Sequence, residues 1–210
     1  MLRLLFLLIT FTALIFRVTN MDLIEFKDDE AVNLFLAARP LFGHQFTPGS
    51  TISSVGILNP PLINYILFPL TLLSLDPKII TLYIGLINSL AIGFLFLILR
   101  RYYGLLVGFI ATILLALSPW SIIYSRKIWP QDFILLLLIP WFLSLHKLFV
   151  DNKPQYWALY TGFSLLLIQL HLPSVFFIVV ATALLLIHKT SLSSRYLLIG
   201  FILGLLQLLK

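Results

Sequence analysis

The longest apolar run of the chain, Ile79–Leu99, holds no charged residue and is long enough to cross a lipid bilayer, which takes about 20 apolar residues in a helix. The whole chain is 60% hydrophobic and has a mean hydropathy of +1.06, outside the range of soluble globular domains. The run lacks the alternation of a barrel strand, and only helices and closed barrels satisfy their backbone inside lipid. We therefore expect an all-α, polytopic transmembrane protein that forms a single domain over residues 1–210.

Further apolar runs recur along the chain, so we expect about seven spanning helices. Besides Ile79–Leu99 they are Leu4–Phe16, Leu105–Tyr124, Phe133–Val150, Tyr156–Leu170, Pro173–Ile187 and Tyr196–Leu209. The first of them lies behind Arg3 and ends without the small residues that signal peptidase reads. This favours an uncleaved first helix over a secretory signal peptide.

Positive charge orients these helices, because cytoplasmic loops carry an excess of Lys and Arg. Arg3, the pair Arg100-Arg101 and the stretch "HKTSLSSR" then face the cytoplasm, and the acidic loop after the first helix faces outward. An odd number of crossings must separate that loop from Arg100, and Ile79–Leu99 supplies one. The short, proline-interrupted run Pro60–Leu75 is therefore predicted to be re-entrant or interfacial.

Residues 20–59 form the only long polar stretch, which we place on the extracytoplasmic side of a cell membrane. Part of it carries apolar residues at helical spacing, which predicts an amphipathic helix on the membrane surface. These residues are Val32, Phe35, Leu36 and Leu41. By the same count of crossings, Arg126 with Asp132 and, further on, His171 also lie on the outer face.

The stretch "DLIEFKDDEAV" holds five of the eight acidic residues of the chain. A carboxylate at a membrane surface can act as a general base, as a metal ligand or as solvated charge. Asp28, Asp29 and Glu30 are consecutive, so at most two of them can face one site. Their spacing alone favours a helix N-terminus, where acids interact well with the helix dipole.

Arg126 suits phosphate recognition, because its guanidinium stays charged and presents a planar fork of donors. In the alternative interpretation, Arg126 and Asp132 are interface anchors within an aromatic belt at headgroup level. That belt would consist of Trp120, Tyr124 and Trp129.

No metal or cofactor motif is recognisable in the sequence. His171 stands alone near a predicted helix end, where a hydrogen-bonded cap is the alternative to a ligand contact. The four histidines have no metal-ligand spacing, and the chain has no cysteine. We expect no cofactor and leave a divalent metal open. The net charge of +6 lies mostly at helix ends, which indicates topology and contact with anionic membrane lipids rather than nucleic-acid binding.

Four segments of the chain form a pattern when they are taken in order. They are "ALIFRVTNMDLIEFKDDEAV", "LNPPLINYILFPLTLL", "LLALSPWSIIYSRKIWPQDFILLLL" and "LLIQLHLPSV". The first three resemble the "DE" loop, the "PPL..Y" segment and the "sP…ysR…D" stretch of GT-C membrane glycosyltransferases, and the fourth resembles a later outer-face turn. The class is that of the dolichyl-phosphate-mannose–protein mannosyltransferases and 4-amino-arabinose transferases. The order and spacing carry the match, which covers nearly the whole chain.

This resemblance implies inverting transfer of a sugar from a polyprenyl-phosphate donor to a glycan, lipid or protein acceptor on the extracytoplasmic face. Asp29 would be the general base, with Glu30 beside it. Arg126 would lie near the donor phosphate, and Asp132 would help to order the site. The possible substrate contacts are Asp28, Asn59, Tyr65 and His171, although many relatives have Lys or His at the position of Asn59.

The family usually runs to more than twice this length, so the chain is expected to be an N-terminal portion that lacks the C-terminal part of the family fold. Two other interpretations stay open. A transporter or flippase for a lipid-linked sugar would need polar residues at mid-membrane depth, and the predicted helix centres are almost bare of charge. A truncated remnant without catalytic activity is the other.

Overall fold

The structure of the protein is a computed structural model, in which residues 2–52, 56 and 58–206 are described. Every regular element within these residues is a helix, and the one bridge of β type joins Ile52 and Leu58. The prediction of an all-α fold is confirmed for this part of the chain. In order, the elements are α1 (Leu2–Val18), η1 (Met21–Leu23), α2 (Asp28–Ala38), η2 (Arg39–Phe42), α3 (Leu62–Thr71), α4 (Pro77–Tyr103), α5 (Leu105–Leu117), α6 (Pro119–Ile123), η3 (Pro130–Phe133), α7 (Ile134–Phe149), η4 (Pro154–Tyr156), α8 (Trp157–Leu170), α9 (Ser174–Ile187) and α10 (Ser194–Leu205).

The long helix α4 has clear sequence signals at both ends. The side chain of Asp76 accepts a hydrogen bond of 2.8 Å from the backbone N–H of Lys78, and Pro77 occupies the first helical position. Arg100 lies in the last turn, where a cation interacts favourably with the helix dipole. Gly104 then takes a φ of +91°, which lets the chain turn directly into α5.

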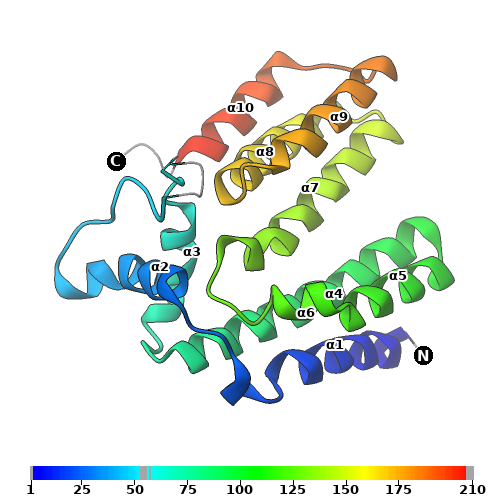
Figure 1. Ribbon diagram of the computed structural model, residues 1–210. Coiled ribbons are helices and arrows are strands. Elements are labelled where there is room, and N and C mark those ends of the chain that lie inside the picture. Colours follow the sequence, from blue (N-terminus) through cyan, green and yellow to red (C-terminus); the bar gives the residue numbers. More distant parts are fainter. Residues whose placement is uncertain (1, 53–55, 57, 207–210) are drawn as a thin grey trace.

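The helices form two packed groups, as Figure 1 shows. In one group α1 packs against α4 and α5, around a core of Ile9, Ala13, Ile92, Phe96 and Ala116. In the other, α8 packs against α7, α9 and α10, and Trp141, Trp157 and Tyr160 are buried between them. Helix α7 also contacts α4 and so joins the two groups.

The polar loop between α1 and α4 folds over one end of the molecule. Helix α2 packs against α3, and both contribute to a core that α4, α8 and the segment before α7 complete. Its buried members are Leu34, Ala37, Leu62, Ile63, Leu67, Ile80, Ile84, Ile128, Phe133 and Leu170. Helix α3 has 10 residues, which makes it about 15 Å long and too short to cross a bilayer of about 30 Å.

Two helical segments are long and apolar enough to cross a membrane by length and composition alone, namely Pro77–Tyr103 and Pro130–Phe149. Four more are apolar but shorter: Leu62–Thr71, Leu105–Leu117, Ser174–Ile187 and Ser194–Leu205. These results cover only the described residues, and positions 207–209 of the predicted last span lie outside them.

One expected helix is interrupted. The run Leu105–Tyr124 was predicted to be continuous, but α5 ends at Leu117 and a separate short helix starts at Pro119. Ser118 between them is extended, with φ −61° and ψ 123°. A residue before proline is pushed out of the helical region by the proline ring, which explains the break.

Candidate functional site

The acidic stretch forms the N-terminus of α2. Asp28, Asp29 and Glu30 all lie in its first turn, in agreement with the simplest reading of their spacing. Their environments differ: Asp28 and Asp29 are exposed, whereas Glu30 is fully buried. Glu30 Oε2 accepts a hydrogen bond of 3.1 Å from the backbone N–H of Lys27, so this carboxylate holds the start of the helix.

Lys127 is a second cation beside Lys27 in this region, and the sequence did not single it out. Its Nζ pairs with Glu25 and lies 4.0 Å from Glu30 Oε1. The same ammonium lies 4.0 Å from the ring centre of Trp129, within cation–π range. Hydrogen bonds from Lys127 and Lys27 lower the pKa of Glu25 to about 2. The only sequence signal was a second basic residue directly after Arg126.

Asp132 orders the turn before α7. It is buried, and its Oδ2 accepts a hydrogen bond of 2.8 Å from the backbone N–H of Trp129. Its backbone carbonyl accepts another, of 2.9 Å, from Asn88 Nδ2 on α4. From α2, Asn33 Nδ2 donates to the carbonyl of Ile128 at 3.0 Å. Asp132 Oδ1 has no hydrogen-bond partner, which leaves a buried acceptor beside this turn.

Three other predicted site residues contact partners other than Asp132. Arg126 Nη2 donates to the backbone carbonyl of Asn20 at 2.8 Å, so the guanidinium ties the residues that follow α1 to the segment before η3. Asn59 bonds with Thr51 across the isolated bridge of the polar loop. Tyr65 on α3 packs its ring against Phe46, with ring centres 4.5 Å apart.

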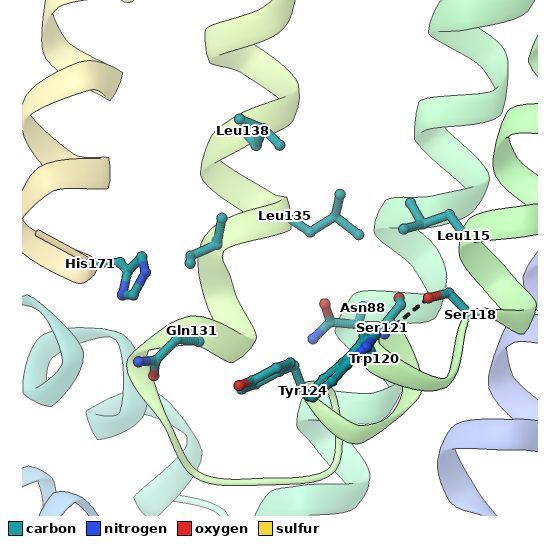
Figure 2. Close-up of a pocket in the computed structure, with 11 residues that line it drawn as sticks. Asn88, Leu115, Ser118, Trp120, Ser121, Tyr124, Gln131, Leu135, Leu138 and His171 are labelled. Carbon is teal, nitrogen blue, oxygen red and sulfur yellow. Dashed lines mark hydrogen bonds between the residues drawn. The ribbon is translucent and has the colours of Figure 1, made fainter. Parts of the chain in front are cut away.

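A pocket of about 520 Å³ opens between α4, α5, α6, α7 and the end of α8. Figure 2 shows its polar side chains gathered at one end and its leucines at the other. The polar and aromatic lining residues are Asn88, Ser118, Trp120, Ser121, Tyr124, Gln131 and His171; the aliphatic ones are Leu115, Ile134, Leu135 and Leu138. Of the predicted site residues within the described chain, His171 alone lines this pocket.

The lining of the pocket carries no charge at neutral pH. Burial lowers the pKa of His171 below its usual value of 6.5, so the imidazole is neutral at pH 7. The other polar groups of the lining are amides, hydroxyls and an indole. Asn88 belongs both to this wall and to the hydrogen bond that holds the backbone of Asp132, and it thereby connects the pocket with the turn before α7.

The pocket combines a polar end, suited to the hydroxyl groups of a sugar, with an aliphatic end suited to a hydrocarbon chain. Among the described residues, no three His, Asp or Glu side chains are grouped so that they could hold a metal ion. Comparisons with protein-family models, with curated proteins and with solved structures gave no match.

Proposed function

We propose that the protein is a membrane glycosyltransferase of the GT-C type, or the N-terminal module of one, that uses a polyprenyl-phosphate-linked sugar. The observation that carries the proposal is the two-ended pocket, with amide, hydroxyl and aromatic groups at one end and leucines at the other. The first turn of α2, with Asp28, Asp29 and Glu30 as an acidic cluster, supplies a candidate base. The described contacts of Lys127 with Glu25 and Glu30 join two of the segments that carry the family resemblance.

In the proposed topology α1, α4, α5, α7, α8, α9 and α10 are seven crossings of a cell membrane, and α3 does not cross. The ends of the helices support it, because α2, η3 and the end of α8 gather at one side of the bundle, and the α4–α5 and α7–α8 turns lie at the other (Figure 1). Arg100 and Arg101 belong to the second side, which is then cytoplasmic. The pocket and the acidic cluster face the extracytoplasmic side.

In the proposed reaction, an acceptor oxygen attacks the anomeric carbon of the donor, and the bond from that carbon to the phosphate oxygen breaks. Asp29 takes the acceptor's proton, and polyprenyl phosphate leaves. The Asp29 side chain is exposed and open to an acceptor, which supports Asp29 rather than its neighbour Glu30 as the base. Glu30, by contrast, is buried and engaged with the backbone of Lys27. Glu30 therefore supports the helix that presents Asp29.

The test measures release of polyprenyl phosphate, a product common to every sugar and acceptor. The purified full chain in proteoliposomes is supplied with polyprenyl-phosphate hexoses and pentoses and with a membrane extract as the source of acceptors. We expect Asp29→Asn to lower the rate at least about 100-fold, the usual scale of general-base catalysis.

Asp151→Asn is the matched control, because Asp151 is an exposed acid at the opposite end of the bundle, paired with Lys147. It should leave the rate unchanged. Wild-type rates in Asp29→Asn would remove Asp29 as the base, and a wild-type protein that releases no polyprenyl phosphate from any donor would overturn the proposed function.

A further inference from the structure

Arg17, near the end of α1, is a fully buried arginine. Its Nη1 donates to the backbone carbonyls of Ala13, at 3.0 Å, and Ala116, at 3.1 Å. Its Nη2 donates to Ser121 Oγ at 2.7 Å. The guanidinium therefore lies where α1, the end of α5 and the short helix α6 meet.

Within the described part of the chain this buried cation has no counter-ion. Among the described residues no carboxylate oxygen lies within 4.0 Å of Arg17, and its Nε has no hydrogen-bond partner. The carbonyl of Ala116 belongs to the last turn of α5, and the negative end of a helix dipole offsets only about half a charge. A buried charge is costly unless it is paired, so the site is short of negative charge.

A ligand bound in the pocket can supply the negative charge that Arg17 lacks. Ser121 lines the pocket and also accepts the hydrogen bond from Arg17, so the guanidinium lies one hydrogen bond behind the pocket wall. No described contact uses the hydroxyl proton of Ser121, which leaves it available to a ligand. Because a hydroxyl that accepts from a cation becomes a stronger donor, Ser121 can transmit part of the charge of Arg17 to that ligand.

We propose that the polar end of this pocket binds a phosphate group, with Ser121 as the direct donor and Arg17 as the positioning residue that supplies the positive charge. This deepens the proposed function and rests on it for the identity of the ligand as a lipid-linked phosphate. The sequence assigned the phosphate to Arg126 instead, but Arg126 does not line the pocket and bonds with the carbonyl of Asn20. A lipid phosphate and free phosphate share this chemistry, and the experiment separates them.

The experiment measures equilibrium binding of radiolabelled polyprenyl phosphate to the full chain in detergent micelles. Unlabelled polyprenol, phosphatidic acid and inorganic phosphate serve as competitors. We expect Arg17→Gln to weaken binding of polyprenyl phosphate at least about tenfold, as for loss of a charged hydrogen-bond partner, and to leave competition by polyprenol unchanged. Arg17→Lys should retain part of the affinity. Arg100→Gln is the control, because it removes an exposed arginine from the opposite end of the bundle.

Ser121→Ala keeps the proposal testable if Arg17→Gln does not fold. It removes one hydroxyl from the wall and leaves the bonds from Arg17 to Ala13 and Ala116 in place. We expect the same selective loss of phosphate affinity, several-fold in size. Equal losses for polyprenyl phosphate and polyprenol would show a structural role for Arg17 and would overturn the inference.

The remaining outcomes separate the inference from the proposed function. Binding of polyprenyl phosphate that depends on Arg126 and is insensitive to Arg17→Gln and Ser121→Ala would overturn the inference and leave the proposed function standing. Arg17-dependent binding of phosphatidic acid or inorganic phosphate, without binding of polyprenyl phosphate, would support the phosphate site and overturn the donor assignment. A wild-type protein that binds none of the phosphate probes would overturn the site itself.

Discussion

The ammonium of Lys127 lies 4.0 Å from the carboxylate of Glu30, which is fully buried in the first turn of α2. Lys127 belongs to the connection between α6 and η3, far from α2 in the sequence. The contact fixes the acidic helix against the segment that precedes α7. The position of the exposed Asp29 therefore depends on a lysine that does not itself touch the pocket.

Replacing this lysine should destabilise the protein. We expect Lys127→Met to lower the free energy of unfolding by about 3 kcal/mol, because it leaves a buried carboxylate without its cation. Chemical denaturation in detergent measures this change. The double variant Glu30→Gln/Lys127→Met should lose less than the sum of the two single variants. Lys147→Met, which breaks the exposed pair with Asp151, should cost clearly less, and an equal cost for both lysines would contradict the prediction.

The stability that Glu25 contributes should depend on pH. Its pKa is lowered in the folded protein from 4.5 to about 2, mainly by the hydrogen bond from Lys127. A lowered pKa contributes stability that is present above pH 4.5 and is lost as the pH falls towards 2. We expect wild type to melt at a higher temperature than Glu25→Gln between pH 5 and 7. The two melting temperatures should converge as the pH falls from 4.5 to 2. A difference that does not change over this range would contradict the assignment.

Asn88 should anchor the turn before α7. Its Nδ2 donates to the backbone carbonyl of Asp132, and the residue is 5% exposed. We expect Asn88→Ala to cost about 1–3 kcal/mol of stability, because a buried carbonyl loses its donor. Ser89→Ala is the neighbouring control, since Ser89 Oγ bonds only to the carbonyl of Gly85 in its own helix. Denaturation of both variants measures the difference, and equal stability would show that the contact between helices contributes nothing.

Adding a methyl group at Gly200, where α10 packs against α8, should destabilise the protein. A Cβ on Gly200 would lie 2.4 Å from the carbonyl oxygen of Ala158, so Gly200→Ala must move a backbone. We expect a loss of about 1–3 kcal/mol. A Cβ on Gly162, on the facing helix, would meet its nearest atom at 3.4 Å, an ordinary contact. Gly162→Ala should therefore be neutral or slightly stabilising, because alanine favours a helix. Thermal denaturation of the two variants decides between them.

Much of the fold follows from the sequence because apolar runs and helix-end signals are local. The run Ile79–Leu99 lies within α4, the acidic stretch begins α2, and the short run after Pro60 became the ten-residue helix α3. The break at Ser118 was not predicted, although Pro119 disfavours a helical conformation for the residue before it; Pro69 and Pro140 lie inside helices of the same chain, so a proline alone does not locate a break.

The candidate site was harder to predict because cations at helix ends look alike in a sequence. Arg17, Arg126 and Lys127 are all basic residues near predicted helix ends, although the structure gives each a different partner. The main partners of Arg17 and Arg126 are backbone carbonyls and a serine, which leave no charge pattern to search for. Only the packing of α1 against α5 and α6 shows that Arg17 is buried behind a pocket.

The lengths of the helices have a consequence for the membrane itself. Helix α4 has 27 residues and is about 40 Å long, whereas α9 has 14 and is about 21 Å long. With a hydrocarbon core of about 30 Å, the apolar run Ile79–Leu99 of α4 matches the bilayer, whereas in the proposed topology α9 is shorter than the core. The lipids beside α9 must then thin. The protein would then deform its surroundings into a wedge and bring the headgroups of neighbouring lipids deeper on the α9 side.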